Sequence, residues 1–316
     1  MIKDNYLYNT EYQNIDDFIP SSGSIYIYGY STEGRSYSVD VLIKKFNSQV
    51  NFVQIKENGK DRIIDLSSNN EYSLRNSEDI NGFFNLFKSH IIYIDVTGLN
   101  NRISASLLKH ALQLSLCTSF PEIRVIYAEP DTYKIERFKS EGVFNDLSEQ
   151  ISGIDPLPGF ASIIPDEIGE SIFVVLLGFE GGRFTHIIEN IQPQGDTIIP
   201  VVGIPGFRLE YPFVAYWGNR RPIQETDTWR NVKFVAANSI VDIYIFLSKL
   251  EKKYPNKKIK IAPIGTKPHA IGAIIFAIKY FNKVEIIYDN PIRKKKRTTG
   301  VGKIVECKVC KLVKEK

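Results

Sequence analysis

Glycine, hydroxyl and basic side chains gather in short loops of this chain, as they do in loops that hold phosphate. The sharpest case is Gly265-Thr266-Lys267-Pro268-His269, which follows an apolar run and precedes a run of small residues. Glycine lets a backbone approach an anion, threonine can cap a helix, and the free N–H groups at a helix start attract phosphate. We therefore expect Gly265, Thr266 and Lys267 to contact a phosphate-bearing nucleotide ligand. A merely solvated Lys267 is the alternative, and His269 fits ligand contact and a place in the first helical turn equally well.

Two other loops combine glycine with arginine, whose planar fork suits bidentate contacts with phosphate. The alternative is that Arg35 and Arg183 pair with Glu33 and Glu180 as local ion pairs, which is more plausible for the second loop than for the first. The further residues expected to contact the ligand are Ser31, Thr32, Gly34, Arg35 and Ser36 in the first loop, Glu180, Gly181, Gly182 and Arg183 in the second, and Thr97, Gly98, Arg102 and Asp289 elsewhere.

Catalytic chemistry is less clearly marked than binding. Asp95, Glu129 and Asp289 stand at the ends of expected strands, where carboxylates can do acid–base work. They can equally cap helices, orient loop amides or bind arginines. No Walker A loop, dinucleotide fingerprint or nucleophile elbow occurs in the sequence. The sequence therefore leaves open whether the protein is an enzyme.

The elements that must position these loops are apolar runs, each followed by a glycine-containing loop and a helical pattern. Such alternation is typical of a parallel α/β sheet with Rossmann-like topology. In such sheets, ligands bind beyond the carboxyl ends of the strands. The expected strands are 24–29, 91–96, 122–127, 172–178, 259–264 and 284–288, and the expected helices are 37–46, 103–116, 184–191 and 269–281.

The two halves repeat the same landmarks in the same order, which predicts an internal duplication. Gly-Arg follows the first strand of each half, a glycine follows a later strand, and Tyr-x-x-Pro follows the last. The predicted organisation is a first Rossmann-like unit at 1–145, a connection at 146–170, a second unit at 171–292 and a basic tail at 293–316. The long aromatic segment 203–231 is expected to be functional or interfacial.

The second half also resembles a known family. Ile264-Gly265-Thr266-Lys267-Pro268, with the helix and strand that follow, resembles the Thr-Gly-Gly-Thr-Lys-Pro type motif of CRISPR-associated Rossmann-fold sensors, the CARF group, although Ile264 stands where that motif has glycine. Members of that group bind cyclic oligonucleotides at a dimer interface. The resemblance covers residues 171–292 and implies ligand contacts from 180–183 and 265–269. It also implies a sensor of prokaryotic antiviral defence that acts with a partner effector.

Charge is distributed unevenly along the chain. Residues 293–316 hold ten of the 40 Lys and Arg and only two acidic residues, whereas the rest of the chain is net acidic. The run Arg293, Lys294, Lys295, Lys296 and Arg297 is expected to contact a protein partner or nucleic acid, with a solvated flexible tail as the alternative. The acidic body disfavours a broad nucleic-acid-binding surface.

Cys307 and Cys310 form half of a zinc-ribbon pattern, and no second pair completes it within the sequence. Three cysteines, no apolar signal segment and no apolar run long enough to span a bilayer favour a cytoplasmic protein without a membrane contact. Three functions remain in competition: a nucleotide-binding sensor or regulator, an enzyme acting on a phosphorylated or nucleotide substrate, and a nucleic-acid-binding or assembly subunit.

Overall fold

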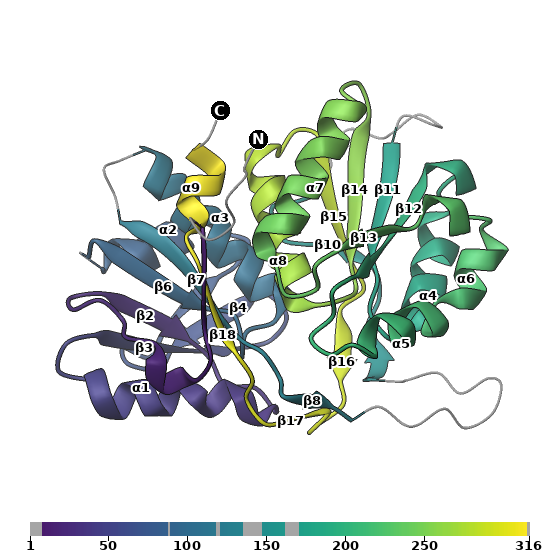
Figure 1. The fold of residues 1–316 in the computed structure, drawn as a ribbon. Helices are drawn as coiled ribbons and strands as arrows, with labels where there is room; N and C mark the ends of the chain where they lie inside the picture. Colours follow the sequence, from purple (N-terminus) through teal and green to yellow (C-terminus); the bar gives the residue numbers. More distant parts are fainter. Residues whose placement is uncertain (1–7, 88, 118–120, 135–146, 162–170, 315–316) are drawn as a thin grey trace. The chain divides into compact units, whose positions relative to one another are not determined.

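The computed structural model describes residues 8–87, 89–117, 121–134, 147–161 and 171–314, which fold into two compact units (Figure 1). Unit 1 spans Met1–Lys134 and Lys295–Lys316, and unit 2 spans Ile135–Lys294. The predicted separate tail is therefore corrected, because the last residues of the chain complete unit 1. The described part of the predicted connection likewise belongs to unit 2.

Unit 1 contains a sheet in the order β1-β18-β7-β6-β2-β3-β4-β5. The inner strands β7, β6, β2 and β3 are parallel, and the strands outside them are antiparallel to their neighbours. The bounds are β1 Asn9–Tyr12, β2 Ile25–Tyr28, β3 Asn51–Glu57, β4 Arg62–Asp65, β5 Asn70–Ser73, β6 Ile91–Asp95, β7 Glu122–Ala128 and β18 Ile304–Cys307.

Helices cover both faces of this sheet, so its inner strands are buried apolar runs. Helix α1 (Val39–Phe46) covers one face, and α2 (Ser77–Asn85), α3 (Asn101–Cys117) and α9 (Val309–Lys314) cover the other (Figure 1). The expected helix 37–46 begins as a 3-10 turn, Gly34–Ser38, before it becomes α1. A second 3-10 turn lies at Ile15–Asp17.

Unit 2 contains a sheet in the order β10-β15-β14-β11-β12-β13, in which only the edge strand β10 is antiparallel to its neighbour. The bounds are β10 Asp155–Pro156, β11 Ser171–Leu176, β12 Ile198–Gly203, β13 Lys233–Val235, β14 Lys258–Pro263 and β15 Val284–Tyr288. The order β15-β14-β11-β12 repeats the order β7-β6-β2-β3 of unit 1. The predicted α/β class with mainly parallel sheets is confirmed, and the shared strand order is the one that a duplication predicts.

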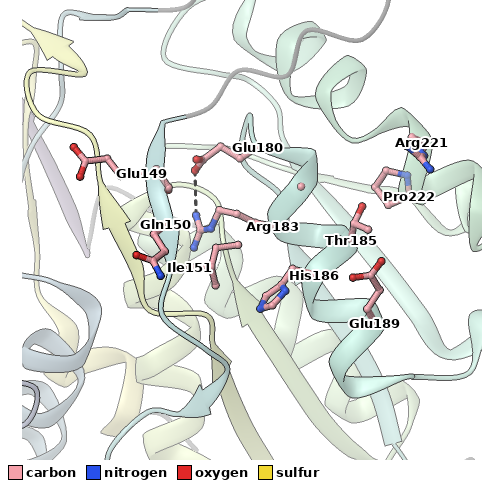
Figure 2. A pocket seen from close by; sticks show the side chains of 12 residues that line it. Glu149, Gln150, Ile151, Glu180, Arg183, Thr185, His186, Glu189, Arg221 and Pro222 are labelled. Carbon is pink, nitrogen blue, oxygen red and sulfur yellow. Dashed lines mark ion pairs between the residues drawn. The ribbon is translucent and has the colours of Figure 1, made fainter.

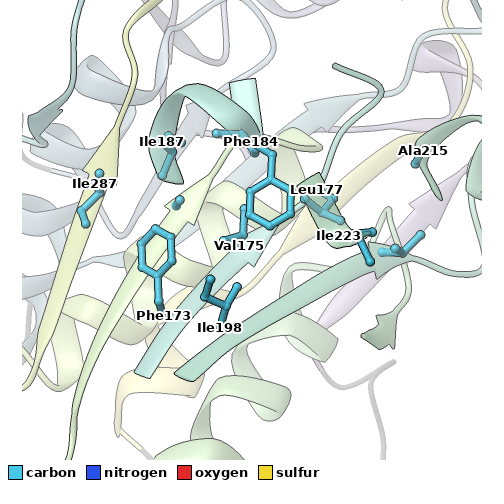
Figure 3. Packing of buried hydrophobic residues seen from close by; sticks show 12 residues of the cluster. Phe173, Val175, Leu177, Phe184, Ile187, Ile198, Ala215, Ile223 and Ile287 are labelled. Atoms are coloured by element: carbon cyan, nitrogen blue, oxygen red, sulfur yellow. The ribbon is translucent and has the colours of Figure 1, made fainter. Parts of the chain in front are cut away.

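The helices of unit 2 also lie on both faces of their sheet (Figure 1). Helices α4 (Gly181–Ile191), α5 (Tyr211–Gly218) and α6 (Arg220–Glu225) cover one face, and α7 (Ile240–Lys253) and α8 (Lys267–Lys279) cover the other, with 3-10 turns at Gly195–Thr197 and Trp229–Asn231. Figure 3 shows Phe184 of α4 next to Val175 of β11, in a buried cluster that also contains Phe173 of β11 and Ile223 of α6. A Cβ on Gly272 would lie 2.1 Å from Ile243, so glycine there lets α8 pack closely on α7.

Two short antiparallel pairs flank the segment that joins unit 2 to the last part of unit 1. Strand β9 (Ser148–Ile151) pairs with β16 (Pro291–Arg293) in unit 2, and β8 (Thr132–Tyr133) pairs with β17 (Thr298–Thr299) in unit 1. The basic run therefore begins at a strand and ends next to another, and it is not a free tail. Among the described residues, no helix combines the length and the apolar character needed to cross a bilayer.

Candidate functional site

Each sheet has a topological switch point, where the chain connections from two neighbouring parallel strands run to opposite sides of the sheet. In unit 2 this point lies between β11 and β14, and in unit 1 it lies between β2 and β6. Crevices at such switch points are where open α/β sheets bind ligands. The loops that were predicted to bind phosphate follow these four strands, so the structure brings the predicted loops of each unit together in pairs.

The glycines at the switch points have a packing role. A Cβ on Gly98 would lie 1.8 Å from the carbonyl oxygen of Gly29, and one on Gly265 would lie 2.4 Å from that of Leu177. Both glycines thus admit the backbone of the neighbouring loop, and the ligand contact expected of them stays a prediction. The Gly218 carbonyl oxygen likewise occupies the space beside Gly181, since it would lie 1.9 Å from a Cβ placed on that glycine.

Gly34 and Gly182 behave differently from the other predicted glycines. Both are exposed, and a Cβ on either would meet nothing within 4 Å. Gly182 lies in the first turn of α4, whose N-cap residue Glu180 makes no side-chain capping bond. The amino end of α4 therefore presents backbone beside an open space at the carboxyl end of β11.

Arg183 is buried and held by its own unit. Its Nε and Nη2 donate to the two carboxylate oxygens of Asp289 at 2.6 Å, and its Nη1 donates to the Ile264 carbonyl at 2.7 Å. Burial acts to lower the guanidinium pKa, but Asp289 and Glu180 outweigh it and raise that pKa. Asp289 is fully buried as well, and its carboxylate is engaged by Arg183.

Arg35 is buried in the corresponding place of unit 1. Its Nε donates to Glu33 at 2.7 Å, its Nη1 donates to the Ala128 carbonyl at 2.7 Å, and its guanidinium lies over the ring of Tyr127. Burial alone would raise the pKa of Glu33, but Arg35 and Arg297 lower it to about 2. Both Arg35 and Arg183 thus form the local ion pairs that were the alternative to ligand binding. This includes Arg35, for which an ion pair was the less plausible interpretation of the sequence.

The other predicted residues of the first loop form a local hydrogen-bond network. The Ser36 hydroxyl donates to the Glu33 carbonyl at 2.8 Å and accepts from the Ser31 N–H at 3.0 Å. Thr32 and Gly34 are exposed at the tip. The hydroxyl-rich composition that suggested phosphate therefore serves largely to fold the loop, and Thr32 and Gly34 are the residues that face outward.

In unit 1 the second switch loop is tied to the neighbouring strands. The Thr97 N–H donates to Asp95 at 2.9 Å, and its hydroxyl accepts from the Ala128 N–H at 2.9 Å. Arg102 is buried and pairs with Asp61. These contacts give Thr97 and Arg102 structural roles, and their expected ligand contacts stay a prediction.

In unit 2 the corresponding loop, which precedes α8, contains the capping residue of that helix and is partly exposed to solvent. The Thr266 hydroxyl accepts from the His269 N–H at 3.4 Å and donates to the Ala237 carbonyl at 2.7 Å. The buried His269 ring places Nε2 2.9 Å from the Ala236 carbonyl, and burial lowers its pKa to about 4. His269 therefore takes the structural alternative. Lys267, the first residue of α8, is half-buried at the switch point.

A groove of about 920 Å³ runs beside α4 (Figure 2). Glu180, Gly182 and Arg183 were predicted from the sequence, whereas β9 and α6 were not, because no sequence pattern links those segments to the switch point. Its lining holds the carboxylates Glu149, Glu180 and Glu189, while the lining arginines both make ion pairs. The remaining lining residues are Ser148, Gln150, Ile151, Thr185, His186, Arg221 and Pro222.

The basic run is partly neutralised within the units. Arg293 pairs with Glu180 at 3.0 Å, and the Arg297 Nε donates to Glu33 at 2.6 Å. Lys294, Lys295 and Lys296 are exposed. Two of the five cations predicted to contact a partner or nucleic acid thus have carboxylate partners within their own units, and the contact itself stays a prediction.

The cysteines of the half zinc-ribbon pattern are free thiols in unit 1. Cys307 is buried in β18, and burial raises its thiol pKa. The Cys310 sulfur accepts from the Ile123 N–H at 3.1 Å. Among the described residues, no three His, Cys, Asp or Glu side chains converge as a metal site would require.

Comparisons with known proteins give little further information. No family model matches the chain, and no curated protein matches it in sequence. Among solved structures, the chain is similar to a GDP-L-fucose synthetase from Naegleria fowleri, at 9% identity over 90% of this chain and 87% of that one. The TM-score is 0.22, and a likeness of that size says nothing about function.

Proposed function

We propose that unit 2 binds a phosphate-bearing nucleotide at the β11/β14 switch point, and that the protein is a nucleotide sensor of prokaryotic antiviral defence that acts through a partner effector. The observation that supports the site is the position of two helix starts. Helices α4 and α8 begin within three residues of the close contact between Gly178 and Gly265. Helix starts attract anions, and Lys267 adds a cation there.

A binding role fits better than a catalytic one. Of the carboxylates that could do acid–base work, Asp95 accepts from the hydroxyl of Tyr26 at 3.0 Å, and Asp289 is held by Arg183. His269 is buried against a backbone carbonyl. Asp95, Asp289 and His269 thus each make a structural contact within the protein. The resemblance of residues 264–268 to the CARF motif supports a cyclic oligonucleotide as the ligand.

The partner effector has a suitable surface on α5. Phe213 is 76% exposed and Trp217 is 47% exposed on successive turns of this helix, and Leu209 just before it is 90% exposed. The Arg220 guanidinium lies 4.1 Å from the centre of the Trp217 ring. Tryptophan, tyrosine and arginine dominate the energetics of protein–protein contacts, which favours a protein partner at the segment that the sequence marked as interfacial.

Titration calorimetry of the full chain with cyclic and linear oligonucleotides tests the site. Lys267→Ala is expected to weaken binding about tenfold, because a charge-assisted contact to phosphate contributes about 1.5–3 kcal/mol. Lys252→Ala is the matched control, since Lys252 is an exposed lysine at the far end of α7. Equal affinity in wild type and Lys267→Ala would remove this site, and recovery of a chemically altered ligand would favour the enzyme alternative.

A further inference from the structure

A glutamate lies between two arginines in the first-strand loop of unit 1, which comprises residues 29–38. Glu33 accepts from Arg35 through Oε2 at 2.7 Å and from Arg297 through Oε1 at 2.6 Å. The Thr298 hydroxyl adds a bond of 3.1 Å to the same carboxylate. Only 7% of the Glu33 side chain is exposed, so water replaces these partners poorly. The conformation of this loop therefore depends on Arg297.

The first-strand loop of unit 2, residues 178–183, repeats this arrangement. Glu180 lies 3.5 Å from Arg183 and 3.0 Å from Arg293. Its other oxygen accepts from the Leu147 N–H at 2.9 Å. In both units, a buried arginine within the loop and a second arginine from residues 293–297 share one buried glutamate. The two units thus repeat one arrangement of a glutamate and two arginines.

The two outer arginines belong to one short segment, residues 293–297, which we call the strap. Only three lysines separate Arg293, which serves unit 2, from Arg297, which serves unit 1. Backbone bonds hold both ends: the Lys294 N–H donates to Leu147 at 3.0 Å, and the Arg297 carbonyl accepts from Lys134 at 2.9 Å. The two arginines therefore belong to one short covalent segment whose ends are each held by a backbone bond within their own unit.

We infer that Arg293 and Arg297 are positioning residues for the two first-strand loops, and that the strap couples the conformation of one loop to that of the other. Release of the Glu180 contact loosens the strap and weakens the Arg297–Glu33 contact. A conformational change in the first-strand loop of unit 2 thereby alters the conformation of the first-strand loop of unit 1. This inference concerns the ligand-free chain and does not depend on the ligand proposed above.

Hydrogen exchange of two backbone amides tests the coupling directly. The Ser36 N–H donates to the backbone carbonyl of Glu33 at 3.0 Å, and the Arg183 N–H donates to the backbone carbonyl of Glu180 at 3.1 Å, so each amide reports on the conformation of one loop. Arg293→Gln is expected to speed exchange of the Arg183 amide about tenfold, as loss of a charge-assisted contact would. It is also expected to speed exchange of the Ser36 amide about threefold, although Ser36 belongs to the other unit.

Lys295→Gln is the matched control, because it removes one charge from the tip of the strap, where Lys295 is exposed, and leaves both clamped glutamates in place. Arg293→Lys keeps the charge, and it should restore slow exchange of both amides at least in part; it also serves as the milder variant if Arg293→Gln does not fold. If Arg293→Gln changes only the Arg183 amide, the coupling is wrong. If it changes neither amide, or if Lys295→Gln acts as strongly, the positioning role is wrong too.

Discussion

The buried arginines of the two units occupy corresponding positions but are held by different chemistry. In unit 2, Arg183 faces the buried carboxylate of Asp289. In unit 1, Arg35 instead lies over the ring of Tyr127. Each of the two arginines also donates to a backbone carbonyl and shares a glutamate with an arginine of the strap. The difference shows that the Gly-Arg landmark marks a shared scaffold. Each unit has its own way of offsetting the cost of a buried guanidinium.

The cores of the two units also differ in their chemistry, because that of unit 1 is richer in tyrosine. Unit 1 packs Tyr26, Tyr28 and Tyr93 around the Asp95 end of β6, with rings in tilted contact. The core of unit 2 shown in Figure 3 is built from aliphatic residues and phenylalanine. Unit 1 thus places hydroxyls and a carboxylate near its switch point, whereas unit 2 leaves the start of α8 with a capping threonine and a lysine. This contrast is why the anion site is proposed for unit 2.

Replacing the buried arginines is expected to give the largest difference in unfolding free energy between the two units. Arg183→Met leaves Asp289 buried without its charge partner and should cost about 3–5 kcal/mol of unfolding free energy. Arg35→Met should cost about 1–3 kcal/mol, because Glu33 keeps Arg297. Urea unfolding measures both: Trp217 and Trp229, the two tryptophans, report unit 2, and far-ultraviolet dichroism reports the whole chain. Arg221→Met, at an exposed helical pair, is the control, and equal losses for Arg35 and Arg183 would contradict the contrast.

Acid should destabilise unit 2 through the buried ring of His269. Burial lowers the pKa of His269 to about 4 from an ordinary value of about 6.5. Above pH 6.5 the histidine is neutral in both states, and as the pH falls the unfolded chain takes up the proton first. Unit 2 should therefore lose about 3 kcal/mol between pH 6.5 and pH 4. Tryptophan-monitored unfolding should show this slope, and His269→Gln should flatten it; an unchanged slope would exclude His269 as its source.

The glycines at the two switch points give the smallest of these effects. Gly98→Ala and Gly265→Ala force a methyl group against a backbone oxygen and should cost about 1–3 kcal/mol, with Gly98 the larger because its contact is shorter. Gly34→Ala and Gly182→Ala meet open space and should change stability by only about 0.5 kcal/mol. Thermal unfolding of the four variants compares them, and a cost at Gly182 equal to that at Gly265 would mean that close packing is not the cause.

The strand–helix alternation was readable from the sequence because parallel strands covered on both faces are short apolar runs. Strand β18 was not foreseen: Ile304–Cys307 lies in a charged segment and contains Glu306, which pairs with Arg124 of β7. Its place between β1 and β7 depends on pairing across most of the chain, which no local pattern encodes.

The positions of the loops were predicted better than their roles. Arginine, glycine and serine near a helix start suggest an anion site, but whether they bind a ligand or one another depends on distant partners. Asp289 lies 106 residues from Arg183, and Ala128 lies 93 residues from Arg35. Local composition could not distinguish these cases, since the same donors satisfy a carboxylate, a carbonyl or a phosphate.

The split of unit 1 between the two ends of the chain has a consequence for biosynthesis. Its sheet lacks β18 until residues 304–307 have been made, and until then β7 has an open edge and β1 has no partner strand. Unit 2 is continuous, so the ribosome delivers it whole before it delivers the strand that completes unit 1. Unit 2 can therefore be complete before unit 1, whereas domains generally fold in order from the N-terminus during synthesis. During that interval the open edge of β7 is exposed to pairing with other nascent chains.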